Sequence, residues 1–161
     1  MTSTGPGKPP FESIVQTHGA AVLRVCRALL GPIDADDAWS ETVLSALRAY
    51  PDLPDDANAE AWLVTIAHRK AIDAMRSRGR RPTPVAQVPD AATQESPDHE
   101  VWPHVAALPD RQRAAVICHH VAGLPYRDVA NIMDCSEAAA RRSAADGMAS
   151  LRATLTKERT P

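Results

Sequence analysis

The consecutive residues Cys118, His119 and His120 combine a thiol with two imidazoles, groups that can hold a zinc ion or form a cysteine–histidine nucleophile. Neighbouring residues of a helix point to different faces, so these three side chains cannot converge on one tetrahedral metal ion. No carboxylate is spaced to orient His119, and the sequence has no glycine-rich loop that would cradle phosphates. The sequence therefore predicts no metal site, no cofactor and no catalytic residue, which argues against an enzyme.

A basic cluster lies between residues 69 and 81, where six arginines and lysines accompany a single acid, Asp73. Guanidinium groups neutralise phosphates and an aromatic ring stacks on an unpaired base, so arginines beside Trp62 could form a strand-separating surface. The alternative is a solvated helix exterior with Trp62 in the core. The candidate residues of this basic set are Trp62, Arg69, Lys70, Arg76 and Arg80.

The stretch GLPYRDVANIMDCSEAAARRS, residues 123–143, has the layout of a helix-turn-helix. A short helix is followed by a break at Asp134, and Ser136 is placed to cap a second helix that starts at residue 137. Side chains early in such a second helix face base edges in the major groove, and others contact phosphates. The alternative is a helical hairpin with exposed arginines. The candidate residues of this helix-turn-helix set are Arg127, Ser136, Glu137, Ala139, Ala140, Arg141, Arg142 and Ser143.

Acidic residues open the stretch DADDAWSETVLSALRAY, residues 34–50. Asp34 is placed to cap a helix here, and the acids of the first turns either dock on a basic partner surface or complement the positive end of the helix. An apolar stripe predicted to face the core consists of Trp39, Val43, Ala46, Leu47 and Tyr50. The candidate partner-binding residues of this acidic set are Asp36, Asp37, Glu41 and Leu44.

Apolar residues spaced three or four apart predict helices almost everywhere, and no stretch alternates as a strand does. We expect an all-α protein with two small domains, one of three or four helices over residues 11–81 and one with the helix-turn-helix over residues 100–156. Residues 1–10 are expected to be a disordered N-terminus. Residues 82–99 include four prolines and are expected to form a flexible, proline-rich linker.

Composition limits the environment and the partners of the chain. Its three cysteines, Cys26, Cys118 and Cys135, are widely spaced and odd in number, which predicts reduced thiols in a reducing compartment. No segment has the length and apolarity of a membrane span or a signal peptide, so we expect a cytoplasmic protein without membrane insertion. The net charge of −2 does not itself indicate a polyanion-binding protein, and only the local charge distribution can do so.

In their order and spacing these segments resemble the extracytoplasmic-function class of bacterial sigma factors, within the sigma-70 family. DADDAWSETVLSAL is similar to the family's polymerase-binding segment, and AWLVTIAHRKAIDAMRSRGRR is similar to its promoter-melting helix. Residues 108–152, from LPDRQR to MASLR, are similar to its minus-35 domain. The resemblance implies a sigma-2-like domain and a sigma-4-like domain that bind core RNA polymerase and promoter DNA and direct transcription initiation.

The resemblance also implies a role for each set of candidate residues. The acidic set is expected to bind core polymerase, the basic set to contact and melt the minus-10 element, and the helix-turn-helix set to contact the minus-35 element. Many relatives are held by an anti-sigma factor, so a partner of that kind is a further expectation.

The sequence also departs from the family's pattern. Asp134 stands where the family usually has glycine in the turn, and Asp146 and Gly147 stand where it commonly has basic residues, which predicts weaker DNA contacts there. Two alternative functions are a helix-turn-helix regulator that acts without polymerase and a polymerase-binding protein with weakened DNA contacts. Co-purification with core polymerase separates a sigma factor from the first of these.

Overall fold

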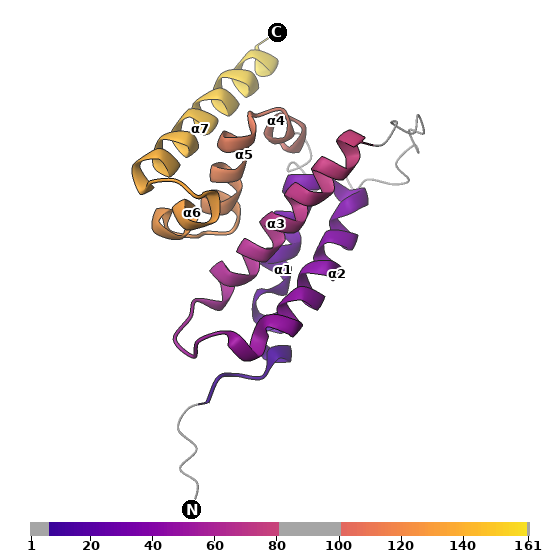
Figure 1. Ribbon diagram of the computed structural model, residues 1–161. Coiled ribbons are helices and arrows are strands. Elements are labelled where there is room, and N and C mark those ends of the chain that lie inside the picture. Colours follow the sequence, from indigo (N-terminus) through magenta and orange to yellow (C-terminus); the bar gives the residue numbers. More distant parts are fainter. Residues whose placement is uncertain (1–6, 81–100, 161) are drawn as a thin grey trace, which may run out of the picture.

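The computed structural model describes residues 7–80 and 101–160, and within these two stretches all regular secondary structure is helical (Figure 1). The first stretch contains α1 (Phe11–Leu30), α2 (Pro32–Ala49), the 3₁₀ turn η1 (Tyr50–Asp52) and α3 (Ala59–Arg80). The second contains α4 (Trp102–Ala106), α5 (Asp110–Val116), the π-helical turn η3 (Ile117–Val121), α6 (Tyr126–Met133) and α7 (Glu137–Arg159). The all-α prediction is confirmed, whereas the predicted linker, residues 82–99, and residues 1–6 lie outside the described residues.

The boundary between α1 and α2 is set by Gly31 and Pro32. Gly31 has a φ of 79°, a conformation that glycine adopts without steric cost, and its N–H donates to the Arg27 carbonyl at 2.8 Å. Pro32 then occupies the first position of α2, where its missing N–H costs no intrahelical hydrogen bond. The predicted cap at Asp34 is therefore wrong, because the helix begins two residues earlier and Asp34 lies in its first turn.

The buried face of α2 is made of small residues. Thr42 is fully buried and its hydroxyl donates to the Ala38 carbonyl at 2.7 Å, while Leu47 is 51% exposed. The predicted inward position of Leu47 is wrong, because the buried face follows a spacing of three or four residues that includes residues 42 and 46 and leaves 47 outside. The buried residues of this face are Ala35, Ala38, Thr42 and Ala46.

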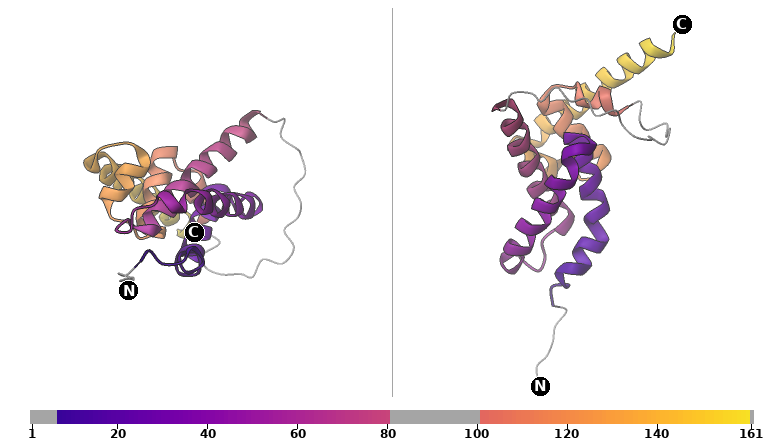
Figure 2. Two further views of the ribbon diagram at one scale, coloured as in Figure 1. Left: turned by 60° about the horizontal axis from the view of Figure 1, so that its bottom comes forward. Right: turned by 90° about the vertical axis from the view of Figure 1, so that its right-hand side faces the viewer.

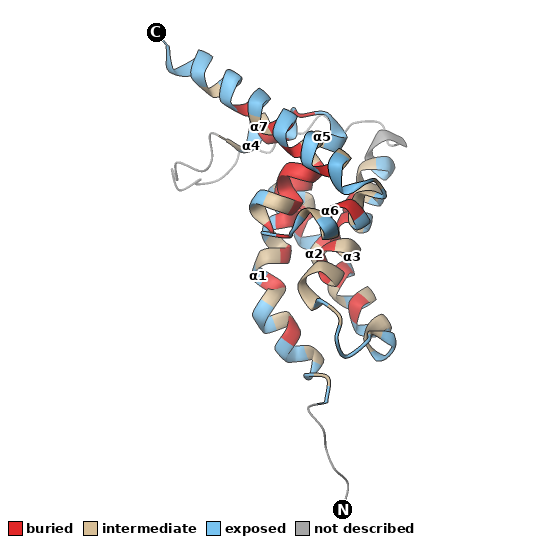
Figure 3. Ribbon diagram, turned by 90° about the vertical axis from the view of Figure 1, so that its left-hand side faces the viewer, coloured by how far each residue is buried: buried red, intermediate tan, exposed pale blue. Residues whose placement is uncertain are grey.

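Helices α1, α2 and α3 pack into a three-helix unit, and α4 to α7 form a second unit against α1 and α3 (Figures 1 and 2). Buried residues of both units, among them Val25 and Val64 in the first and Ile117 and Val129 in the second, belong to one hydrophobic cluster. Exposed residues dominate the last turns of α7, which extend beyond the cluster (Figure 3). The two units therefore share a core in this structure.

The N-terminal residues that precede α1 contact the end of α2. Lys8 Nζ donates to the carbonyls of Tyr50 at 2.5 Å and Leu53 at 2.8 Å, and it lies 4.4 Å from the centroid of the Tyr50 ring. The Tyr50 hydroxyl in turn donates to the Pro9 carbonyl. Lys8 thus satisfies backbone acceptors just beyond the C-terminal end of α2, where the chain leaves the helix, and Tyr50 ties the segment before α1 to the same place.

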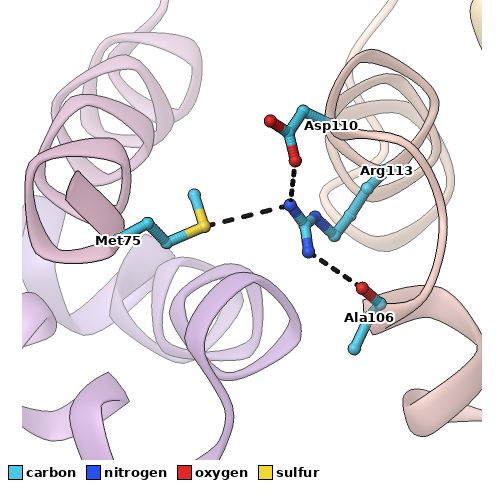
Figure 4. A network of polar contacts seen from close by, with 4 residues as sticks. All are labelled: Met75, Ala106, Asp110 and Arg113. Atoms are coloured by element: carbon cyan, nitrogen blue, oxygen red, sulfur yellow. Dashed lines mark hydrogen bonds and ion pairs between the residues drawn. The ribbon is translucent and has the colours of Figure 1, made fainter. Parts of the chain in front are cut away.

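Arg113 of α5 links the two units by its guanidinium group (Figure 4). Its nitrogens donate to Asp110 Oδ1 at 2.5 Å and to the Ala106 carbonyl at 2.9 Å within the second unit, and to Met75 Sδ of α3 at 3.9 Å. The Arg113 side chain is only 13% exposed, whereas its partner Asp110 is 92% exposed, so the ion pair is open to water on the side of the carboxylate. The Arg113 guanidinium thus satisfies the carbonyl of the last residue of α4 and also contacts the first unit.

A cavity of about 420 Å³ lies beside this link, between the two units. Leu29 of α1 and His68 of α3 line it from the first unit, and Ala114 lines it from the second. Burial, and secondarily the charge of Arg69, lowers the pKa of His68 below its ordinary value, so this imidazole is neutral at pH 7. The lining of the cavity therefore combines apolar side chains and a neutral imidazole with three charged residues, Arg76, Asp110 and Arg113.

Gly147 permits the close approach of α7 to α5. A Cβ atom at this position would lie 2.7 Å from Val116 Cγ2 and 3.3 Å from the Gln112 carbonyl oxygen. Gly147 has a low helix propensity, but its lack of a side chain is required for α7 to pack closely against α5.

The substitution Gly147→Val is expected to lower the free energy of unfolding by about 1–3 kcal/mol, because the added atoms overpack a contact already filled by Val116. Urea unfolding followed by circular dichroism measures the change. The control Ala149→Val adds a β-branched residue at an exposed position of the same helix, and its expected cost is about 0.5 kcal/mol. Equal losses in both variants would show that close packing at Gly147 does not matter.

Candidate nucleic-acid interface

The thiol and imidazoles of residues 118–120 diverge. Cys118 is fully buried, His120 is exposed, and His119 is partly buried with Nδ1 2.8 Å from the Leu124 carbonyl oxygen. Burial raises the pKa of the Cys118 thiol to about 12, so the reactive thiolate is absent at neutral pH. Within residues 7–80 and 101–160, no three His, Cys, Asp or Glu side chains are grouped so that they could hold a metal ion.

The turn between α6 and α7 has the local geometry that the sequence predicts. Ser136 is the N-cap of α7 and its Oγ accepts a hydrogen bond from the Ala139 N–H at 3.1 Å, which confirms both the cap and the predicted start of the helix. Asp134 has a φ of 52°, and the following N–H, of Cys135, donates to the Ala130 carbonyl at 3.0 Å. Aspartate therefore adopts here the left-handed conformation that glycine favours.

The helix-turn-helix set lies at the start of α6 and α7, and most of its side chains are exposed. Ala140 is the exception: it is fully buried, so its inclusion among the DNA-contacting candidates is wrong, because its methyl group packs in the core. Ala139 and Ser143 are partly buried. The exposed members of the set are Arg127, Ser136, Glu137, Arg141 and Arg142.

The three arginines of this set differ in their surroundings. The Arg127 side chain is 79% exposed, with Nε 3.9 Å from Asp128 Oδ1. Arg141 donates to Glu137 Oε1 at 3.0 Å, and its guanidinium carbon lies 4.6 Å from the centroid of the Tyr126 ring. Arg142 has no hydrogen bond or ion pair within the described part of the chain. Sequence reasoning missed the contribution of Tyr126, since no spacing rule joins residues of different helices.

The basic set of α3 divides between a ridge and a groove. Trp62, Arg69 and Arg76 are spaced by seven residues, which is close to two helical turns, so they share one face of the helix. Arg69 and Arg76 are exposed, whereas Trp62 is partly buried and its ring centroid lies 6.5 Å from that of Tyr50. Trp62 therefore combines packing against the core with a remaining accessible surface. The side chain of Arg80 lies outside the described residues.

Lys70 occupies a different environment from these arginines. It lines a groove of about 350 Å³ between α2 and α3, together with several carboxylates. Opposite charges in such a groove attract one another, so Lys70 partly neutralises the acids around it. The acidic residues that line this groove are Asp34, Asp37, Glu41 and Asp73.

The acidic set forms an exposed stripe along α2, at the edge of the groove that this helix shares with α3. Asp37, Glu41 and Leu44 follow one another at spacings of four and three residues, and all three are exposed. Leu44 and Leu47 are 53% and 51% exposed, so the carboxylates are bordered by apolar side chains that water does not solvate well. Asp36 is exposed as well, one residue outside the stripe. The stripe combines the charge and the apolar surface that a protein partner with basic residues would complement.

Comparisons with known proteins match the two units of the chain to two different families. Residues 14–81 match the family Sigma-70 region 2, and residues 105–151 match the family Sigma-70, region 4. The probable RNA polymerase sigma-C factor of Mycobacterium bovis is 30% identical over 133 residues, covering 78% of this chain and 72% of that protein. The ECF RNA polymerase sigma factor SigM of Mycobacterium tuberculosis is 28% identical over 146 residues, covering 88% and 74% respectively.

Two solved structures share the fold. The sigma factor RpoE, crystallised with the anti-sigma factor NepR from Bartonella quintana, superimposes with a TM-score of 0.79 at 21% identity, covering 92% of this chain and 98% of that chain. CnrH, solved in complex with the cytosolic domain of CnrY, gives a TM-score of 0.71 at 22% identity and covers 91% and 88%.

Proposed function

The chain belongs to the extracytoplasmic-function sigma factors of the sigma-70 family, and on that premise we propose which of its surfaces contact RNA polymerase and promoter DNA. As a sigma factor it directs transcription initiation with RNA polymerase, and it acts by binding rather than by catalysis. The observation that carries the assignment of surfaces is the capped helix-turn-helix, with Arg141 and Arg142 exposed in the first turns of α7.

The second unit contacts the minus-35 element through α6 and α7. The exposed N-terminal turns of α7 present Arg141 and Arg142, which can donate to base edges or phosphates along the major groove, and Glu137, which can accept only from a donor on a base edge. Arg127, at the start of α6, contacts a phosphate. Ser136 and the partly buried Ala139 and Ser143 lie at the edge of this surface, and the Oγ of Ser136 is already used by the helix cap. The contact residues assigned to the minus-35 element are thus those of the helix-turn-helix set without Ala140.

The first unit contacts the minus-10 element through the ridge of α3. Arg69 and Arg76 supply positive charge, and the accessible part of Trp62 supplies an aromatic surface for an unpaired base. Lys70 contributes at the edge of the ridge, with its charge reduced in effect by the neighbouring carboxylates. Arg80 is assigned to the same DNA contact from its position in the sequence alone.

Core RNA polymerase binds the acidic stripe of α2. The exposed carboxylates of Asp36, Asp37 and Glu41 steer a basic polymerase surface, and Leu44 provides apolar area that becomes buried on binding. A protein that works with RNA polymerase in this way is cytoplasmic. In both described stretches, no helix has the length and apolarity needed to cross a bilayer.

An anti-sigma factor is a further partner. The support is the shared fold with RpoE and CnrH, which were each solved with a bound protein, in the first case named as an anti-sigma factor. A protein that grips both units would control access to the two DNA-contacting surfaces.

Run-off transcription with core polymerase on a genomic promoter library tests the proposed function. The expected result is initiation at a limited set of start sites that is absent with core polymerase alone, together with co-purification of the chain with the core enzyme. A chain that binds duplex DNA but neither binds the core enzyme nor promotes initiation would contradict the proposal. The recovered start sites also define the promoter sequence used in the further experiments.

A further inference from the structure

Three side chains from three successive elements of the second unit are stacked on one another. The ring of His119 in η3 lies almost parallel to the ring of Tyr126 in α6, with centroids 3.9 Å apart and an interplanar angle of 14°. The guanidinium of Arg141 in α7 lies 4.6 Å from the centroid of the same tyrosine ring. The stack thus runs from the helix before the helix-turn-helix to an arginine of its second helix.

The His119 ring, at one end of this stack, is fixed in orientation by the backbone. His119 Nδ1 lies 2.8 Å from the Leu124 carbonyl oxygen, and because a carbonyl can only accept, Nδ1 carries the proton and donates. The π-helical turn ends with the Ala122 N–H donating to the Ile117 carbonyl at 3.0 Å, and Gly123 follows with a φ of 72°. Single π turns occur frequently at functional sites, and here the turn sets the direction of the imidazole.

Arg141 is restrained on two sides. The Tyr126 ring attracts its guanidinium by a cation–π interaction, and Glu137 accepts a hydrogen bond at 3.0 Å from one of its nitrogens. Its side chain still remains 61% exposed, so the restrained group is accessible to DNA. Neighbouring Arg142 is exposed and has no such restraint among the described residues.

Restraint matters because an arginine that reads a base must present its donors in fixed directions. A flexible side chain loses rotamer freedom on binding, whereas a preorganised one has already lost it, and a fixed guanidinium fork matches the two acceptors of a guanine edge. A phosphate, by contrast, accepts hydrogen bonds from many directions. Arg141 therefore has the surroundings of a base-reading residue, and Arg142 those of a phosphate-contacting residue.

We propose that Tyr126, supported by His119, is a positioning residue that holds Arg141 for base-specific contact with promoter DNA, while Arg142 contacts the phosphate backbone. This inference rests on the proposed contact of α7 with the minus-35 element and adds to it a division of labour between two adjacent arginines. Tyr126 itself does not touch DNA in this arrangement.

The test uses holoenzyme assembled from core polymerase and the full chain, with duplex promoters in which the upstream element is randomised. Arg141→Ala is expected to reduce discrimination at one base pair by about tenfold or more. Tyr126→Leu is expected to reduce discrimination at the same base pair by about three- to tenfold, and to have no further effect in the Arg141→Ala background. Tyr126→Phe keeps the ring and is expected to behave as the parent chain.

Arg142→Ala is the matched control, since it removes the same charge one residue away. It is expected to weaken binding uniformly across sequences and to lower the salt dependence by about one phosphate contact, without changing base preference. In this background Tyr126→Leu should keep its full effect. A loss from Tyr126→Leu that is as large without Arg141 as with it would overturn the inference, because it would then reflect a general effect on the fold.

The outcomes also separate this inference from the proposed function. If Arg141→Ala impairs promoter use and Tyr126→Leu does not, the positioning role alone is overturned. If Arg141→Ala and Arg142→Ala both leave promoter use unchanged while the holoenzyme still initiates, the contact of α7 with DNA fails and the inference fails with it.

A second measurement needs no DNA. In the free chain the side-chain Nε–Hε resonance of Arg141 is expected to be displaced by the ring current of Tyr126, and the displacement should disappear in Tyr126→Leu and persist in Tyr126→Phe. The resonance of Arg142 serves as the internal reference. An Arg141 resonance that does not change in Tyr126→Leu would overturn the stacking on which the inference depends, whatever the stability of the variant.

Discussion

Replacing Arg141 and Arg142 together by alanine is expected to reduce transcription from the cognate promoter by about 100-fold or more, while binding to core polymerase stays unchanged. Each good arginine contact with a base is worth about 1–3 kcal/mol of discrimination, and a phosphate contact adds to the affinity. Both side chains are exposed and alanine favours a helix, so α7 should remain folded. Run-off transcription and a polymerase pull-down measure the two activities.

The control variant also removes two positive charges from α7, but at positions far from the N-terminal end of the helix. Arg152 and Lys157 are exposed in the second half of α7, and Arg152 lies about 15 Å along the helix from Arg142 at 1.5 Å per residue. The variant Arg152→Ala with Lys157→Ala should keep nearly full transcription. If both double variants lose transcription equally, overall charge rather than a reading helix determines promoter use.

Reversing two charges of the acidic stripe of α2, with Asp37→Arg and Glu41→Arg, is expected to weaken binding to core polymerase by about 100-fold. Like charges that face each other across an interface cost several kcal/mol, and both carboxylates are exposed where a basic partner surface would meet them. Binding is measured by titrating the labelled chain with core enzyme, at two salt concentrations because exposed charges are screened.

A matched reversal elsewhere on the first unit controls for net charge. Glu12 lies in α1 and Asp55 follows η1, and both are exposed, so Glu12→Arg with Asp55→Arg changes the charge of the chain by the same amount outside α2. This variant should bind core polymerase as the parent chain does. Because Lys70 shares the groove with Asp37 and Glu41, circular dichroism should accompany both variants. An unchanged affinity of the α2 variant would remove the acidic stripe from the polymerase interface.

Local rules were sufficient for the helix ends that depend on one residue. Ser136 could be identified from its type and its place before Glu137, since a hydroxyl there satisfies an N–H of the first turn, and Gly31 and Gly123 mark ends where φ is positive. Periodicity was less reliable for α2. There, a threonine satisfies its own hydroxyl within the helix and occupies the core, so the rule that apolar residues lie inside placed Leu47 wrongly.

The features that determine the candidate site in detail depend on contacts between distant residues. The burial of Ala140, the close approach at Gly147 and the stack on Tyr126 each arise where helices cross, and crossing geometry is not encoded in the spacing of one segment. The same holds for the inner environment of Lys70, which depends on how α2 and α3 are juxtaposed. Sequence patterns therefore identified the helices that carry the site but not the surroundings of each side chain.

The link that Arg113 makes to Met75 has a thermodynamic consequence for any process that moves the units apart. Separation would hydrate apolar atoms such as those of Leu29 and Ala114, at about 25 cal/mol for each square ångström newly wetted. A partner that binds only the separated units must supply this free energy from its own binding. The observed affinity of a partner that binds only the separated units equals its affinity for the separated form multiplied by the fraction of the chain in that form. Substitutions that weaken the contact between the units would therefore raise the observed affinity, although they do not contact the partner.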